Sequence, residues 1–183
     1  MNRNGLIGAL CFSFLAFAAL TAARAQEAAA SAREWVDLKS YACSSVEKRE
    51  QLVGVFDAAL IPALNRLGAG KVGVFWTGAE LNDGSTNYNT TVFVVASYPT
   101  AEALAAADQK LLADAAFMKA AAAVFEAPMK EPLFDACSGS LLYTLATCPQ
   151  VKPVTTSADR LLQLRIYNSY TIERNAKKAS MFE

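Results

Sequence analysis

Histidine is absent from all 183 residues of the chain. Imidazole is the usual general base beside a catalytic serine or cysteine, and it is a common ligand of zinc and haem iron. Its absence excludes Ser-His-Asp and Cys-His catalysis, histidine-ligated haem and most zinc sites. We therefore expect no metal site and no cofactor, and we assign no catalytic residue from the sequence.

Other features that would indicate chemistry are also missing. The glycines at 68–70 lack the lysine and hydroxyl ending of a phosphate-binding loop, so they indicate the end of a helix. The carboxylates do not form a pair suited to acid–base work. Glu47 and Glu50 lie three residues apart on a predicted helix and are interpreted as a solvated face. We interpret Asp108 and Asp114 in the same way.

The chain has no excess of positive charge. Without Arg3 and Arg24, which belong to the N-terminal segment discussed next, 15 of the 17 basic side chains remain against 17 acidic ones. Nucleic acids and anionic lipids are bound by clustered lysine and arginine. We therefore expect no nucleic-acid partner.

Residues 1–25 have the pattern of a cleaved export signal. Leu6 to Leu20 is an apolar run of about 15 residues, shorter than the roughly 20 that a bilayer span needs. Ala23-Arg24-Ala25 has the small residues of a cleavage site, which places cleavage after Ala25. We expect an exported protein, periplasmic or extracellular in a bacterium, with a linker at 26–33 and no membrane span after cleavage.

Cysteine usage allows one disulfide. Once Cys11 has left with the signal, Cys43, Cys137 and Cys148 remain, an odd number. Cys43 follows the first predicted strand and Cys137 precedes the fourth, and these strands are antiparallel neighbours in the expected sheet. We therefore predict a possible disulfide between Cys43 and Cys137, with three ordinary thiols as the alternative.

Apolar alternation and helical periodicity predict six elements in the order β-α-β-β-α-β. They are a strand at 35–41, a helix from about 45 to 67, strands at 71–77 and 90–98, a helical stretch at 101–125 and a strand at 140–147. This order is typical of the ferredoxin-like, split βαβ arrangement, so the predicted fold class is α+β. Along the first strand, Val36 and Leu38 fall on one face and Asp37, Lys39 and Tyr41 on the other.

Local signals place the helix boundaries. Ser44 followed by Glu47 is a capping box that opens the first helix. Pro62 should kink or interrupt that helix near Leu60. We also expect a break in the second helical stretch near residues 113–114.

The chain contains an internal repeat of its first predicted strand and the start of its first predicted helix. Residues 36–57 recur without a gap as residues 162–183, where Leu38, Tyr41, Glu47 and Phe56 are matched by Leu164, Tyr167, Glu173 and Phe182. The repeat predicts a complete module at 34–150, a linker at 151–160 and the truncated start of a second module at 161–183. The second copy should form a strand at 161–167 and a helix from about Thr171.

Two motifs resemble the NIPSNAP family. One is the strand pattern Leu38-Lys39-Ser40-Tyr41, repeated as Leu164-Arg165-Ile166-Tyr167, ahead of a capped helix. The other is the strand at 72–77 followed by the strand at 91–98, and residues 177–183 look like the run that opens the family's second module. The resemblance implies a dimeric α+β barrel fold, usually built of two tandem modules. It implies no catalytic residues.

Five residues form a possible ligand cleft or interface. Lys39 and Arg165, equivalent in the two copies, share their strand faces with Tyr41 and Tyr167. A cation beside a phenol could bind an anionic or carbonyl-bearing small molecule, or the same residues could make interface contacts. Trp76 is interpreted as sheet core or interface.

The sequence favours a non-enzymatic binding or interaction module that pairs through its sheet face. Its partner would be a second copy of the chain or the missing second module. The alternative is a cofactor-free oxygenase or isomerase that uses the region of Lys39 and Tyr41. An enzyme should show a pocket between sheet and helices, whereas a binding module should fill this space with Leu52, Phe56, Leu60 and the alanines of the second helix. The sequence favours the filled space.

Overall fold

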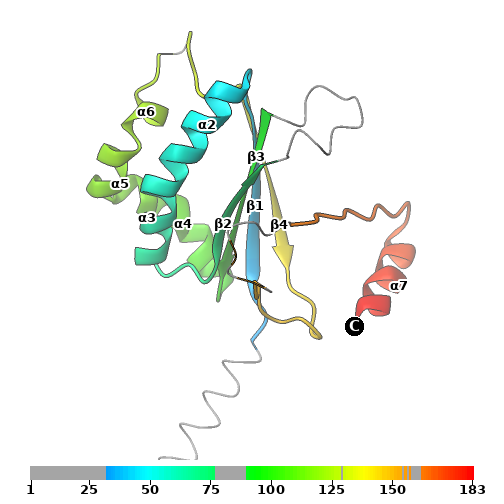
Figure 1. Cartoon of the computed structure of the whole chain (residues 1–183). Helices are drawn as coiled ribbons and strands as arrows, with labels where there is room; N and C mark the ends of the chain where they lie inside the picture. Colours follow the sequence, from blue (N-terminus) through cyan, green and yellow to red (C-terminus); the bar gives the residue numbers. More distant parts are fainter. Residues whose placement is uncertain (1–31, 77–89, 129, 154, 156, 158–161) are drawn as a thin grey trace, which may run out of the picture. The chain divides into compact units, whose positions relative to one another are not determined.

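The computed structural model describes residues 32–76, 90–128, 130–153, 155, 157 and 162–183 (Figure 1). The predicted export signal, its cleavage at Ala25 and most of the linker at 26–33 lie outside the described residues. Among the described residues, none of the helices has the length and apolar character needed to cross a membrane.

Four strands form one antiparallel sheet in the order β2-β3-β1-β4. They are β1 (Trp35–Ala42), β2 (Val72–Trp76), β3 (Thr91–Tyr98) and β4 (Ala136–Tyr143). The central strand β1 pairs with β3 on one side and β4 on the other. With the helices of residues 46–125 on one face of the sheet (Figure 1), this confirms the predicted α+β, ferredoxin-like fold.

The strand alternation of β1 separates two chemically different faces. Asp37, Lys39 and Tyr41 line a cavity beneath the helices. Val36 and Leu38 line a hollow on the opposite face. This is the division predicted from the period-two pattern, because successive side chains of a strand point to opposite sides of the sheet.

The first helical stretch runs from α2 (Val46–Val55) through a π-helical turn, η1 (Phe56–Leu60), into α3 (Ile61–Arg66). The N-cap of α2 is Ser45, whose side chain accepts a hydrogen bond from the Lys48 N–H, so the predicted cap at Ser44 is wrong by one residue. Because an N-cap bonds to the amide three residues on, Glu47 stands one place too early for the predicted box.

Pro62 explains the π-helical turn. Proline has no N–H to donate to the carbonyl four residues earlier, and its ring crowds the preceding turn. The Ile61 N–H bonds instead to the carbonyl of Phe56, five residues back, and Pro62 falls in the first turn of α3. The predicted interruption near Leu60 is thus a widened turn rather than a gap. Gly68, with φ of 85°, ends the stretch as expected of glycine.

The second helical stretch breaks at the predicted place. It consists of α4 (Ala101–Ala113), α5 (Ala115–Ala120) and α6 (Ala122–Phe125). Asp114 separates the first two and caps α5 by accepting from the Phe117 N–H at 3.0 Å. Its other oxygen lies 2.6 Å from the Arg66 guanidinium. The bonds from Phe117 and Arg66 lower the pKa of Asp114.

The fourth strand begins and ends earlier than predicted. β4 covers Ala136–Tyr143 rather than 140–147. Its first four residues are small or polar, so they carry little strand signal, but each pairs with a residue of β1. Pairing therefore overrides propensity. After the strand, the Thr144 hydroxyl donates to the Pro149 carbonyl and accepts from the Glu34 N–H, both at 2.8 Å.

The second copy of the repeat forms only its helix. α7 (Ile172–Phe182) is capped by the Thr171 hydroxyl, as the repeat predicts. Residues 162–169 form no strand, which corrects the predicted strand at 161–167. A strand requires a neighbour for its N–H and C=O groups, and the four strands of the sheet include no partner for this segment.

The predicted disulfide is absent. Cys43, Cys137 and Cys148 are all free. Cys137 lies inside β4, directly opposite Tyr41, so Cys43 two residues further on is its diagonal neighbour. Diagonal pairs are separated by about 7–8 Å, whereas a disulfide needs a Cβ–Cβ distance of about 4 Å. The shift of the strand boundary therefore removes the geometry on which the prediction depended.

Candidate functional site

A cavity of about 350 Å³ lies between the sheet and its helices. The sequence favoured a filled space here, and that expectation is wrong. Phe56 and Leu60 line the cavity, and Leu111, Phe117 and Val124 line it from the second helical stretch, together with one alanine, Ala121. These side chains surround the space without filling it.

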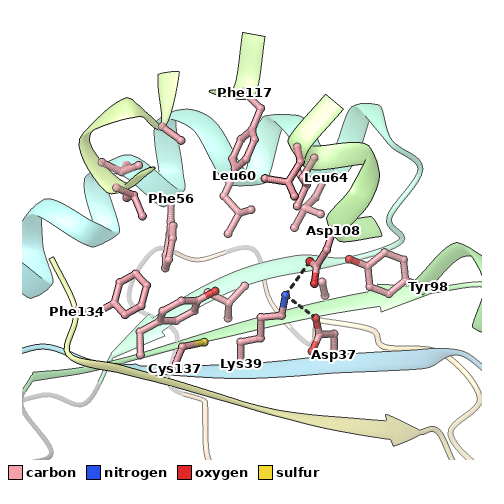
Figure 2. Close-up of a pocket in the computed structure, with 18 residues that line it drawn as sticks. Asp37, Lys39, Phe56, Leu60, Leu64, Tyr98, Asp108, Phe117, Phe134 and Cys137 are labelled. Atoms are coloured by element: carbon pink, nitrogen blue, oxygen red, sulfur yellow. Dashed lines mark hydrogen bonds and ion pairs between the residues drawn. The ribbon is translucent and has the colours of Figure 1, made fainter. Parts of the chain in front are cut away.

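The cavity is apolar except at one end. Its lining comprises Asp37, Lys39, Tyr41, Val55, Phe56, Leu60, Leu64, Val94, Ala96, Tyr98, Asp108, Leu111, Leu112, Phe117, Ala121, Val124, Phe134 and Cys137. Figure 2 shows the charged residues together at one end and the rings of Phe56, Phe117 and Phe134 away from them. An apolar pocket with a few convergent polar groups is typical of a small-molecule site.

The polar end is an ion triplet. The Lys39 ammonium lies 2.9 Å from Oδ1 of Asp108 and 3.4 Å from Oδ2 of Asp37 (Figure 2). Asp37 comes from the same strand as Lys39, two residues before it, and Asp108 comes from α4. Only 17% of the Asp37 side chain is exposed, against 73% of that of Asp108. Asp108 therefore stands where the triplet meets solvent.

The triplet fixes the charge of Lys39. Burial by itself lowers the pKa of the ammonium, but the hydrogen bond to Asp108 and the negative charges of Asp37 and Asp108 outweigh it, so the pKa of Lys39 is raised. Lys39 thus stays protonated at neutral pH. With both aspartates ionised, the cluster carries a net charge of −1.

Two tyrosines complete the site as neutral phenols. Burial raises the pKa of Tyr41, helped by the adjacent Cys137 thiol and opposed by Lys39. Burial likewise raises the pKa of Tyr98. The Tyr41 ring packs edge-on against Phe56 and Phe134, with centroids 5.0 and 5.1 Å away. These contacts hold Tyr41 at the boundary between the polar and apolar ends.

The π-helical turn contributes to the cavity wall. Phe56 and Leu60 are its first and last residues, and both line the cavity. A turn closed by a five-residue bond is wider than an α-helical turn and moves the side chains around it. The widening that Pro62 causes therefore lies where the helix faces the cavity.

The structure brings together two of the predicted site residues and leaves out the others. Lys39 and Tyr41 line the cavity as predicted. Trp76 lines neither the cavity nor the hollow on the other face, and it is 50% exposed at the end of β2. Arg165 and Tyr167 lie in the segment without a strand, so the two copies do not form one cleft. The ring of Tyr167 lies 5.8 Å from that of Phe182.

Sequence reasoning missed three residues of the site. Asp108 was interpreted as a solvated carboxylate; it is exposed, but it also binds Lys39. Asp37 had been placed on the same face as Lys39 without a role, and Tyr98 had none. The signal for Asp37 was present, because a lysine and an aspartate two residues apart on a strand share one face. No pattern could relate Asp108 to them, because its contact depends on how α4 packs.

The opposite face of the sheet carries a second hollow, of about 410 Å³. Its floor is apolar and comes from three strands: Val36 and Leu38 of β1, Phe75 of β2 and Val95 of β3. Leu142 of β4 adds a side chain that is 44% exposed. The chain after β4 also lines the hollow, with Val151, Lys152 and Pro153 and with residues 162–164 at the start of the second copy. The Val151 N–H donates a hydrogen bond of 2.8 Å to the Glu34 carboxylate.

Comparison with solved structures finds proteins similar to this chain. A NIPSNAP-like domain protein from Burkholderia xenovorans is 16% identical, with 69% of this chain and 98% of that chain covered and a TM-score of 0.49. A NIPSNAP family protein from Agrobacterium tumefaciens is 16% identical, with 62% and 87% covered and a TM-score of 0.46. A dimeric ferredoxin-like protein from an uncultured marine organism is 8% identical, with 69% and 96% covered and a TM-score of 0.45.

The chain is similar to NIPSNAP family proteins. That is the family whose motifs the sequence resembles. At these identities the likeness concerns the fold. No protein-family profile matches the sequence, and no curated protein does. The features that bear on function are the cavity beneath the helices and the hollow on the opposite face of the sheet.

Within the described residues, no group of three or more histidine, cysteine, aspartate or glutamate side chains is arranged to hold a metal ion. The donors at the cavity are two carboxylates that already accept from Lys39. What the cavity offers a ligand is an apolar wall and a protonated amine beside two phenols.

Proposed function

We propose that this chain is a non-enzymatic module that binds a small molecule in the cavity between its sheet and its helices. The observation that carries the proposal is the cavity itself, about 350 Å³ of apolar space with a charged cluster at one end. Pockets for small ligands start near about 300 Å³. Apolar side chains that line a pocket of this size stay in contact with water when no ligand is bound, and an apolar ligand would remove that surface from water.

The state of the polar residues favours binding over catalysis. Lys39 is protonated and the phenol of Tyr41 is neutral at neutral pH, so neither accepts a proton from a ligand. A cofactor-free oxygenase or isomerase is the second candidate, because polar groups do point into the cavity. It would need one of the two carboxylates that already bind Lys39 as its base. A bound ligand recovered with added oxygen mass would favour an oxygenase, and a ligand recovered as an isomer of the same mass would favour an isomerase.

Filling the cavity should abolish binding. Ala121 lines the cavity and is 1% exposed, so Ala121→Phe places a ring in the ligand's space. We expect 2-acetylnaphthalene, a neutral aromatic ketone, to bind the wild type and to bind this variant at least about tenfold more weakly, as measured by titration calorimetry.

The matched control is Ala120→Phe, which adds the same ring at the preceding, exposed position. Thermal melts establish that both variants fold. Equal affinity in the wild type and in a folded Ala121→Phe protein, or no binding by the wild type, would contradict the proposal.

We further propose that the module pairs with a second copy of the chain through the open face of its sheet, which is the face opposite the helices. The face is apolar across three strands; residues 151–153 and 162–164 of the same chain line part of it, and Leu142 is left 44% exposed. Apolar side chains on one face of an antiparallel sheet require cover. A second copy presents the same apolar residues. In a twofold interface each copy therefore covers the apolar face of the other. The similar protein from the uncultured marine organism is described as dimeric.

We also propose that the protein is exported from the cytoplasm. It is supported by the apolar run at 6–20 and the small residues ahead of Gln26. Mass spectrometry of the protein recovered from the periplasm should give a chain that begins at Gln26, and a full-length chain confined to the cytoplasm would contradict it.

A further inference from the structure

The ion triplet at the end of the cavity selects the charge of the ligand. From its geometry we propose that the site takes a neutral molecule with a carbonyl or hydroxyl oxygen at one end and an apolar body, and that it rejects anions. This inference rests on the proposed ligand cavity and adds the chemical class of its occupant. It favours the carbonyl-bearing ligand over the anionic one. The sequence had left both classes of ligand open.

An anion would find no unpaired cation in the cavity. Of the residues that line it, Lys39 alone is basic, and its ammonium is shared between two carboxylates at 2.9 and 3.4 Å. The triplet carries one net negative charge. A ligand carboxylate placed beside Lys39 would also lie close to Asp37 and Asp108, so repulsion from two charges opposes attraction by one.

A neutral oxygen acceptor fits the same place. A lysine ammonium has three N–H donors; in Lys39 one of them donates to Asp108 at 2.9 Å, and Asp37 forms an ion pair at 3.4 Å. A remaining donor can bond to a carbonyl or hydroxyl oxygen, and the phenols of Tyr41 and Tyr98 line the same cavity. An ammonium ligand offers no acceptor to Lys39, although the net negative charge of the triplet attracts it.

The rest of the cavity sets the body of the ligand. The wall beyond Lys39 is formed by Phe56, Leu60, Phe117 and Phe134 (Figure 2). Aromatic and branched aliphatic side chains around a closed space bind flat or compact hydrocarbon groups. At about 30 Å³ for each water-sized group, 350 Å³ holds roughly a dozen such groups. This is the size of a two-ring aromatic molecule with a short substituent.

Three probes of equal size and different charge test the inference. 2-Acetylnaphthalene is neutral, 2-naphthoate is an anion of nearly the same shape, and 1-(2-naphthyl)ethylamine is the corresponding cation. Titration calorimetry at pH 7 should show that the wild type binds the ketone at least about tenfold more tightly than 2-naphthoate, and that it binds the amine more tightly than 2-naphthoate. Binding of 2-naphthoate as tight as that of the ketone or of the amine would overturn the inference and leave the proposed cavity standing.

Removing the two carboxylate charges should reverse the rejection of the anion. In Asp37→Asn/Asp108→Asn, Lys39 is left as a net positive charge, so 2-naphthoate affinity should rise by at least about tenfold while ketone affinity changes little. The control Asp57→Asn/Glu131→Gln removes two charges from exposed positions outside the cavity.

If the double variant does not fold, Asp108→Asn alone serves, because its side chain is largely exposed and should tolerate the change. It should raise 2-naphthoate affinity by a few-fold. An unchanged affinity for 2-naphthoate in these folded variants would overturn the inference. If the wild type binds none of the three probes, the proposed ligand cavity itself fails.

Discussion

Replacing Leu38 and Val95 by lysine is expected to convert a dimer of this chain into a monomer. The two side chains lie opposite each other on β1 and β3, and both line the open face of the sheet. Two lysines there would place four like charges in a twofold interface, and a buried unpaired charge is costly. Light scattering should give the mass of two chains for the wild type and of one chain for the variant.

The control carries the same charge change away from the sheet. Ala105 and Gln109 are exposed residues of α4, so Ala105→Lys/Gln109→Lys should remain a dimer. The variant's sheet should stay intact because both lysine side chains can reach solvent in a monomer. A wild type that is monomeric at micromolar concentration, or a Leu38→Lys/Val95→Lys protein that stays dimeric, would contradict pairing through this face.

Replacing Lys39 by methionine should cost about 2 kcal/mol of unfolding free energy at pH 7. Methionine keeps the aliphatic part of the side chain but removes the cation. The Asp37 carboxylate, whose side chain is only 17% exposed, then faces Asp108 without the ammonium between them. The melting temperature should fall by about 7 °C.

The loss of unfolding free energy in Lys39→Met should become smaller at alkaline pH. The folded state raises the pKa of Lys39 above its unfolded value of about 10.4. The stabilisation is therefore fully present below about pH 10 and is lost as the pH rises through the folded pKa. The difference between wild type and variant should be constant from pH 6 to about pH 9 and should shrink at more alkaline pH.

Lys110→Met is the matched control, because Lys110 is exposed on the same helix as Asp108. It should change the melting temperature by less than about 2 °C. A Lys39→Met protein as stable as this control at pH 7 would show that the triplet contributes nothing. A difference that grows toward alkaline pH would contradict the assigned pKa direction.

The sequence was sufficient for the two faces of β1 and for several helix ends because those signals are local. Alternation along β1 placed Lys39 and Tyr41 on one face and Leu38 on the other, and the structure agrees. The break at Asp114 and the end at Gly68 were also predicted, since each depends on capping by one residue. The cap at Ser44 missed by one position because Ser45 has the same side chain.

The errors arose where a partner decides the outcome. β4 begins at Ala136 because β1 supplies its hydrogen bonds, although its first residues have low strand propensity. The strand predicted at 161–167 has the propensity but no partner among the sheet's strands. The disulfide between Cys43 and Cys137 failed for the same reason, since it depended on where β4 begins.

The cavity could not be predicted from composition. Alanine was taken as a residue that fills space beneath a helix, but Ala121 is the one alanine of the second helical stretch that lines the cavity. Whether such a helix closes onto the sheet depends on its distance from the strands, which larger residues such as Phe117 set. The contact of Asp108 with Lys39 depends on the same packing. Only the structure could supply both.

The most direct test of the central claim locates a bound probe by NMR. In a methyl-labelled sample saturated with 2-acetylnaphthalene, intermolecular nuclear Overhauser effects should connect the naphthalene protons to the methyl groups of Leu60, Leu64 and Leu111, which line the cavity. The methyl groups of Leu38, Val95 and Leu142 on the opposite face should show none. Contacts to that second set alone, or no contacts to either, would contradict a ligand cavity between the sheet and its helices.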